Sequence, residues 1–307
     1  MGFLNVLHIK LRQQTVVKLQ ACIRLLKKLE DICLSSPLQP AQSNLYEGKV
    51  ILAPMVKLGR LPMRLLALKY GADLVYTDEI FSQQLKHCTR TKDDRLGLVN
   101  FTCGDFHLFQ TCAAERKKVI LQMGTNDPDE ALEAAKLVQN DVLGIDVNFG
   151  CPTPNAELSQ TGAFLLNRPD LVVQILRKLV NNLSVPVTCK IRVLPDIKET
   201  LELVRRIEST GVSALGVHGR LRVERRNVAV RVNEIKAITE AVSIPVIANG
   251  GSLEYINTFD DIIHFREKTN SLSVMVAQSA IKNTSVFRKN GVLPIHKVIQ
   301  DYVTLVS

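Results

Sequence analysis

The sequence predicts an α/β protein whose strands and helices form one (β/α)8 barrel, the TIM barrel. Short apolar runs recur eight times after residue 49, helical patterns lie between most of them, and together they occupy about 230 residues. Several runs are continuous rather than alternating, as expected of strands buried on both faces. Eight strands that alternate with helices favour a closed barrel over an open sheet.

The predicted elements follow one another regularly along the chain. We expect strands over residues 50–55, 72–76, 119–124, 144–148, 185–191, 214–219, 244–250 and 272–277. Helical patterns cover residues 127–140 and 198–209; the first opens with Asp127 and Pro128, which is typical of a helix start. The segment between Glu79 and Arg116 is long and mixed, so we expect an extra hairpin or a lid there.

The chain divides into three expected regions: a basic amphipathic extension (1–48), the barrel (49–290), and the remnant of a C-terminal helical region (291–307). The first 50 residues hold seven Lys and Arg against three Asp and Glu, so they carry +4 of the net charge of +9. Three interpretations of the extension stay open: a helix packed on the barrel, a mitochondrial targeting segment, or a membrane-surface helix. We expect a cytoplasmic protein, with the mitochondrion as the alternative.

Composition excludes several other classes of protein. With 46% hydrophobic and 22% charged residues, the chain is not disordered as a whole. No stretch of the sequence approaches the ~20 apolar residues that a membrane-spanning helix needs. The seven cysteines include no C-x-x-C pair and the six histidines lie far apart, so the sequence predicts neither a disulfide framework nor a metal site.

Polar and glycine residues gather where the predicted strands end. Because the loops at the carboxyl ends of barrel strands build the active sites of this fold, we expect these residues to surround one site. They are Pro54, Met55, Gln122, Asn148, Cys151, Lys190, His218, Arg220, Asn249, Gly250, Gly251, Ala277 and Gln278.

These residue types favour a cofactor held by a phosphate. Backbone N–H groups of residues 249–251 and after the eighth strand suit a phosphate, whereas neither G-x-G-x-x-G nor G-x-x-x-x-G-K-S/T is present. Two cofactors remain open. With FMN, Gln122 would bond the flavin edge and Lys190 would stabilise negative charge near N1; with PLP, Lys190 would form the Schiff base. Cys151 lies in a glycine–proline turn and is a candidate acid or nucleophile.

The turn around Cys151 has the sequence Asp146-Val-Asn-Phe-Gly-Cys-Pro. An Asn-x-Gly-Cys-Pro turn after the fourth strand is the hallmark of the tRNA-dihydrouridine synthases. This chain resembles that family over about residues 49–295. Further motifs match in the same order: Leu52-Ala-Pro-Met, Leu61-Pro-Met-Arg-Leu-Leu, Gln122-Met-Gly, Thr188-Cys-Lys-Ile-Arg, Val217-His-Gly-Arg and Ile247-Ala-Asn-Gly-Gly. The set is highly specific, and the chain is most similar to eukaryotic members.

The resemblance implies an FMN-dependent oxidoreductase that uses NADPH or NADH to reduce the C5–C6 double bond of a uridine in the tRNA D-loop. We expect a monomer whose partner is tRNA. It implies that Cys151 protonates C5 and that Asn148 holds the uracil edge. Residues that would line the flavin are Pro54, Met55, Gln122, Lys190 and His218. Those that would surround its phosphate are Asn249, Gly250, Gly251, Ala277 and Gln278.

Three features depart from that family's pattern. Gln278 stands where the family usually has an arginine, and Leu158-Ser159-Gln160 stands in place of Lys-Gly-Gly. The region after the eighth strand is short, so we expect a truncated C-terminal region.

A basic loop follows the sixth strand and provides either phosphate contacts for tRNA or a solvated surface. It contains Arg220, Arg222, Arg225, Arg226 and Arg231. Two functions stay open: an active flavin enzyme, and a catalytically silent barrel that binds RNA or a protein.

Overall fold

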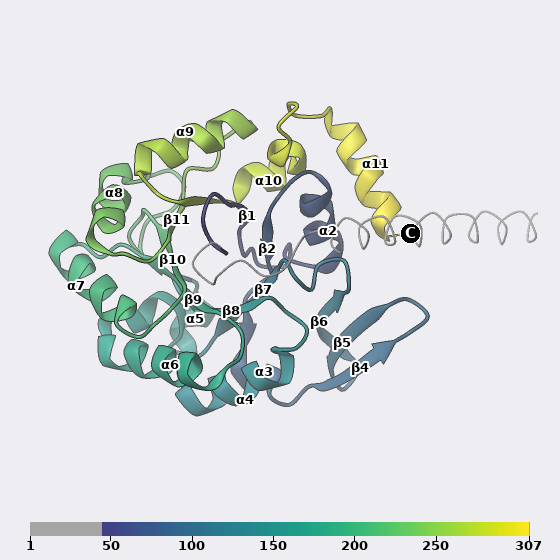
Figure 1. Ribbon diagram of the computed structural model, residues 1–307, viewed down its shortest axis with the longest axis horizontal. Helices are drawn as coiled ribbons and strands as arrows, with labels where there is room; N and C mark the ends of the chain where they lie inside the picture. Colours follow the sequence, from purple (N-terminus) through teal and green to yellow (C-terminus); the bar gives the residue numbers. More distant parts are fainter. Residues whose placement is uncertain (1–44, 307) are drawn as a thin grey trace, which may run out of the picture.

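The computed structural model describes residues 45–306 and shows a closed barrel of eight parallel strands surrounded by helices (Figure 1). Neighbouring strands along the chain pair with one another, β12 pairs with β1, and β2 pairs with β7, which closes the barrel. The predicted fold is confirmed, and each of the eight predicted runs contains a strand. The barrel strands are β1 (Val50–Leu52), β2 (Leu74–Tyr76), β7 (Val119–Gly124), β8 (Gly144–Phe149), β9 (Val187–Arg192), β10 (Ala214–His218), β11 (Val246–Asn249) and β12 (Ser273–Val276).

Helices cover the outside of the barrel, and the sequence explains where they begin. Asp127 caps α4 by accepting hydrogen bonds from the N–H groups of Asp129 and Glu130, as the sequence predicts. Thr258 and Asp261 form a capping box at the start of α9. The outer helices are α2 (Leu61–Lys69), α4 (Pro128–Val138), α6 (Pro169–Asn182), α7 (Ile197–Glu208), α8 (Val232–Ala241) and α9 (Phe259–Thr269); shorter turns are α3 (Ser82–Leu85), α5 (Pro154–Leu158), η2 (Gly162–Asn167), α10 (Gln278–Lys282) and η3 (Thr284–Phe287).

The hairpin expected before β7 is a three-stranded antiparallel sheet at the side of the barrel (Figure 1). It consists of β4 (Thr89–Asp93), β5 (Leu98–Cys103) and β6 (Phe106–Cys112), and the short β3 (Ile80–Phe81) before it pairs with β7. Arg90 of β4 binds both carboxylate oxygens of Asp141, at 2.6 and 2.7 Å. Arg64 of α2 binds Glu115, which follows β6, in a buried ion pair. These two pairs hold the small sheet against the barrel.

The C-terminal helix α11 (Ile295–Val306) packs beside α2. Asp301 accepts a hydrogen bond from the Tyr70 hydroxyl at 2.7 Å and pairs with Lys69 at 3.0 Å. Residues 1–44 of the predicted N-terminal extension lie outside the described residues. Within residues 45–306, none of the helices combines the length and the apolar character needed to cross a membrane.

Candidate active site

A cavity of about 630 Å³ opens at the carboxyl ends of the barrel strands, where the sequence predicts a site. Twelve of the thirteen predicted site residues line it, and Gly251 does not. A Cβ on Gly251 would stand 2.7 Å from the ring of Phe265, so packing against this ring requires glycine here. The phosphate contact predicted for the backbone of Gly251 stays a prediction. Gly250 has φ +113°, a conformation that favours glycine, and it does line the cavity.

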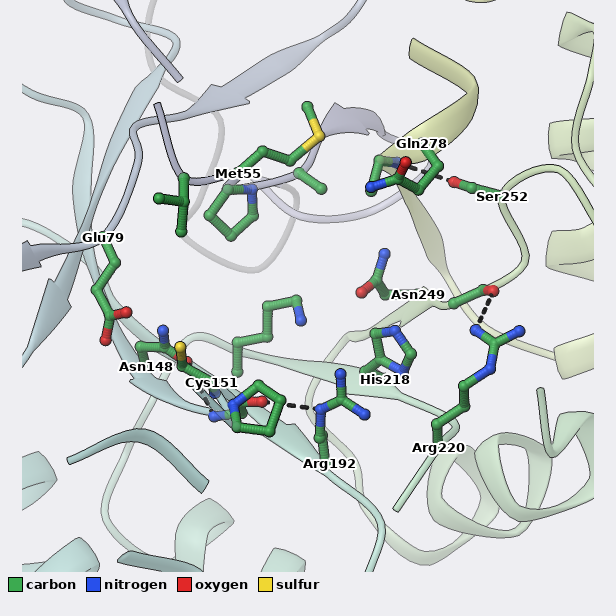
Figure 2. A pocket seen from close by; sticks show the side chains of 18 of the residues that line it. Met55, Glu79, Asn148, Cys151, Arg192, His218, Arg220, Asn249, Ser252 and Gln278 are labelled. Carbon is green, nitrogen blue, oxygen red and sulfur yellow. Dashed lines mark hydrogen bonds between the residues drawn. The ribbon is translucent and has the colours of Figure 1, made fainter. Parts of the chain in front are cut away.

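The turn after β8 presents the Cys151 thiol at the cavity wall (Figure 2). The side-chain oxygen of Asn148 accepts hydrogen bonds from the N–H groups of Gly150 at 2.9 Å and Cys151 at 3.1 Å. Arg192 donates from Nε to the Gly150 carbonyl at 2.9 Å. The Thr153 hydroxyl lies 3.2 Å from Sγ of Cys151. The sequence around Cys151 therefore builds a hydrogen-bonded turn that fixes the position of the thiol.

The Cys151 thiol is held in its protonated form. Burial raises its pKa, and the nearby carboxylate of Glu79 raises it further. At neutral pH the group is therefore a proton donor rather than a thiolate nucleophile.

Glu79 is a site residue that the sequence reasoning missed. It lines the cavity, and burial raises the pKa of its carboxyl. A signal was present, because Thr77-Asp78-Glu79 follows the second strand at the same end of the barrel as the other polar strand ends.

A buried polar cluster lies beneath the cavity. Asp146 accepts hydrogen bonds from Gln122 Nε2 at 2.8 Å and from the Thr188 hydroxyl at 2.7 Å. Burial raises the pKa of Asp146 to about 6. The fully buried side chains of Tyr46 and Tyr76 complete this floor. Because Asp146 holds the Gln122 amide by its nitrogen, the amide oxygen is left for a ligand in the cavity.

Two further basic side chains of the cavity have altered pKa values. Burial lowers the pKa of Lys190 to about 8, and the charge of Arg192 lowers it in the same direction. Burial and the charge of Lys190 place the pKa of His218 well below its ordinary value, so this imidazole is neutral. Its Nδ1 is buried and has no hydrogen-bond partner within the described part of the chain. A bound polar group could supply that partner.

The arginines after β10 do not share one role. Arg220, predicted to contact substrate, lines the cavity but donates to the Gly250 carbonyl at 2.8 Å and pairs with Glu254 at 2.7 Å. Arg231 pairs with Glu224, whose pKa falls to about 2 as a result. These two arginines brace the loop, and the substrate contact predicted for Arg220 stays a prediction. The exposed side chains of Arg225 and Arg226 line the cavity mouth.

Arg222 lies over the ring of Phe164, with its guanidinium carbon 4.3 Å from the ring centroid. This contact joins the basic loop to η2. The exposed Leu158 lies in the nearby α5, which contacts η2. In place of a cation, α5 thus presents an aliphatic side chain to solvent.

The β11–β12 end of the cavity is neutral. Asn249, Gly250, Ser252, Ala277 and Gln278 line it. The N–H of Ala277 donates to the Ser252 hydroxyl at 2.9 Å, which joins the two loops. Among the described residues that line the cavity, Arg220 is the charged residue that bonds to this end, through the Gly250 carbonyl. Its guanidinium is also paired with Glu254.

No group of three or more His, Cys, Asp or Glu side chains within residues 45–306 is arranged to hold a metal ion. The polar groups that face the cavity include a thiol, amides, an imidazole and cations.

Comparisons with known proteins point to one family. The family model described as dihydrouridine synthase (Dus) matches residues 51–302. A tRNA-dihydrouridine(20) synthase of Schizosaccharomyces pombe is 39% identical over 85% of this chain and 56% of its own length. The Saccharomyces cerevisiae protein of the same name is 37% identical over 79% of this chain and 67% of its own length. A tRNA-dihydrouridine(20a/20b) synthase-like protein of Mus musculus is 34% identical over 83% of this chain and 74% of its own length. The chain spans little more than half the length of the S. pombe protein.

Proposed function

Because this chain belongs to the dihydrouridine synthase family, we propose that it reduces the C5–C6 double bond of a uridine in tRNA, with FMN as cofactor and NADPH or NADH as reductant. The observation that carries the proposal is the protonated Cys151 thiol, which faces a cavity lined by Gln122, Lys190 and His218. The D-loop is the expected location of the uridine.

The cavity fits the ring of a flavin. The free oxygen of the Gln122 amide suits an N–H on the ring edge, since Asp146 holds the amide nitrogen. Lys190, with a pKa of about 8, is mostly charged at pH 7 and suits negative charge near the flavin N1. The unpartnered Nδ1 of the neutral His218 suits a further polar atom of the cofactor. When bound, FMN would supply the hydride that C6 of uracil accepts.

The residues of the β8 turn supply the other half of the reduction. Cys151 donates its proton to C5, so that the double bond gains a hydride and a proton together. The Asn148 oxygen is occupied by two backbone N–H groups. Its amide nitrogen interacts with the Glu79 carboxylate and has a second N–H that can hold a carbonyl of uracil. One side chain thus positions both the thiol and the base.

Binding of tRNA has to offset the removal of a base from its stack. This step costs a few kcal/mol, and contacts with the phosphate backbone can compensate for it. Arg225 and Arg226 are exposed at the mouth and suit such contacts. The basic loop therefore supports an RNA substrate rather than a free nucleoside.

The test is a flavin spectrum followed by an assay of the product. Purified protein should be yellow or become so with FMN, and should form dihydrouridine in unmodified tRNA with NADPH or NADH. Cys151→Ala should bind flavin normally and form dihydrouridine at least ~10²-fold more slowly. A colourless protein that binds tRNA would instead favour a catalytically silent RNA-binding barrel.

A further inference from the structure

Glu79 is a titratable group of the cavity that the proposed reaction leaves without a task. Its Oε1 is buried, and no side chain or backbone group within residues 45–306 hydrogen-bonds to that atom. Burial is the largest influence on the pKa of this carboxyl, and no cation is among the groups that act on it. A buried carboxylate without a cation is unfavourable, so its place in a cavity wall indicates a function.

The surroundings of Glu79 direct its carboxyl to the thiol. Figure 2 shows the carboxylate turned toward Asn148 and Cys151, and both side chains act on its pKa by favouring the charged form. Gly124 of β7 leaves space for it, because a Cβ there would stand 2.6 Å from Glu79 Oε1. A larger residue at position 124 would displace the carboxylate.

The positive charges near the thiol favour its deprotonated form, whereas Glu79 disfavours it. Lys190 and Arg192, both on β9, interact favourably with a negative charge on Cys151. The Thr153 hydroxyl also favours the thiolate. These groups lower the pKa of the thiol and would favour loss of its proton. Burial and the Glu79 carboxylate raise the pKa and so keep the thiol protonated.

We propose that Glu79 and Cys151 share a proton, so that Glu79 keeps the thiol protonated before the transfer and returns a proton to it afterwards. This inference rests on the proposed function. The thiol proton passes to C5 of uracil and leaves a negative charge on Sγ. The Glu79 carboxylate then takes a proton from water at the mouth and passes it to Sγ, which restores both the thiol and the carboxylate. Two adjacent negative charges repel each other, so the resting pair holds at least one proton and regains one after the transfer.

The first test measures the thiol in protein without flavin or tRNA. Alkylation of Cys151 by iodoacetamide is followed between pH 6 and pH 10 by mass spectrometry of the peptide that carries it. Glu79→Gln removes the negative charge and keeps the shape, so Cys151 should react roughly tenfold faster at pH 8. Glu79→Ala should give the same profile, because the charge is lost in both variants.

Glu157→Gln is the matched control. Glu157 is an exposed residue of α5, close in sequence to Cys151, and its replacement should leave the alkylation profile unchanged. Thermal melting shows whether each variant is folded. A Glu79→Gln profile that overlays the wild-type profile overturns the proposal, as does a change seen in Glu79→Ala alone, since that result would indicate packing rather than charge.

The second test measures the return of the proton. With excess tRNA and NADPH at pH 7, Glu79→Gln should form the first dihydrouridine per protein at nearly the wild-type rate and then slow at least ~10-fold. A steady rate equal to that of the first turnover overturns the proposal. If the wild-type protein forms no dihydrouridine, the proposed function fails, and the alkylation profiles still decide whether Glu79 controls the thiol.

Discussion

The two sides of the cavity are built differently. On the β8–β9 side, Asn148, Cys151, Lys190 and Arg192 lie close together, and their hydrogen bonds and charges alter one another's pKa values. On the β11–β12 side, neutral groups such as Gln278 line the wall. The charged side chains of the cavity thus lie around the Cys151 thiol, and few lie at the β11–β12 end. A cofactor would be held more by its ring than by its phosphate.

The largest effect is expected from the charged side. Asn148→Ala removes the acceptor for two backbone N–H groups and releases the turn that carries Cys151. A shift of about 1 Å in a reacting group can cost ~10²-fold in rate, so dihydrouridine formation should fall by at least that factor while flavin binding persists. Asn155→Ala, at an exposed position of α5, is the control and should retain full activity.

The next effect is expected from the neutral side. Gln278→Arg should tighten FMN binding about 10-fold to 100-fold, because a charge-assisted bond to the phosphate contributes about 1.5–3 kcal/mol. Riboflavin, which has no phosphate, should bind both proteins equally. Titration of flavin fluorescence measures the two affinities. An equal gain for both flavins would mean that residue 278 does not contact the phosphate.

A pH series tests the charge of Lys190. Its pKa of about 8 means that the side chain is charged at pH 7 and mostly neutral at pH 9. Negative charge on the reduced flavin is then less stabilised, so the rate of flavin reduction by NADPH should fall about tenfold over this range. Lys190→Met should react slowly and show a flatter profile. Stopped-flow absorbance measures both, and an identical slope in the variant would contradict this assignment.

The smallest effect is expected at the mouth. Arg226→Ala should weaken tRNA binding a few-fold and reduce the slope of log affinity against log salt by about 1, as the loss of one phosphate contact does. Arg177→Ala, on the outer face of α6, is the control. Filter binding at several salt concentrations measures the slope. Equal slopes in the wild type, Arg226→Ala and Arg177→Ala would mean that Arg226 does not contact a phosphate and that the basic loop is a solvated surface.

The fold was predictable because its signals are local. Continuous apolar runs mark strands buried on both faces, and caps such as Asp127 mark helix starts. The general location of the site followed from the fold, since the carboxyl ends of barrel strands meet at one end.

The partners within the site were not predictable, because distant loops provide them. Arg220 and Glu254 belong to neighbouring loops, so the ion pair between them is not evident from the sequence. Glu79 meets Cys151 only once the barrel has closed. Gly251 shares a motif with Gly250, but only the fold shows that the Phe265 ring from α9 leaves no room for a Cβ there.

The polar floor of the barrel has a consequence for the order of events in catalysis. Tyr46, Tyr76, Asp146 and Thr188 are almost completely buried, so they seal the cavity from the amino-terminal end of the barrel. A nicotinamide and a tRNA nucleotide would then have to enter through the same mouth, one after the other. If the proposed function holds, shared access through one mouth predicts double-displacement kinetics, in which the oxidised nicotinamide leaves before the RNA enters.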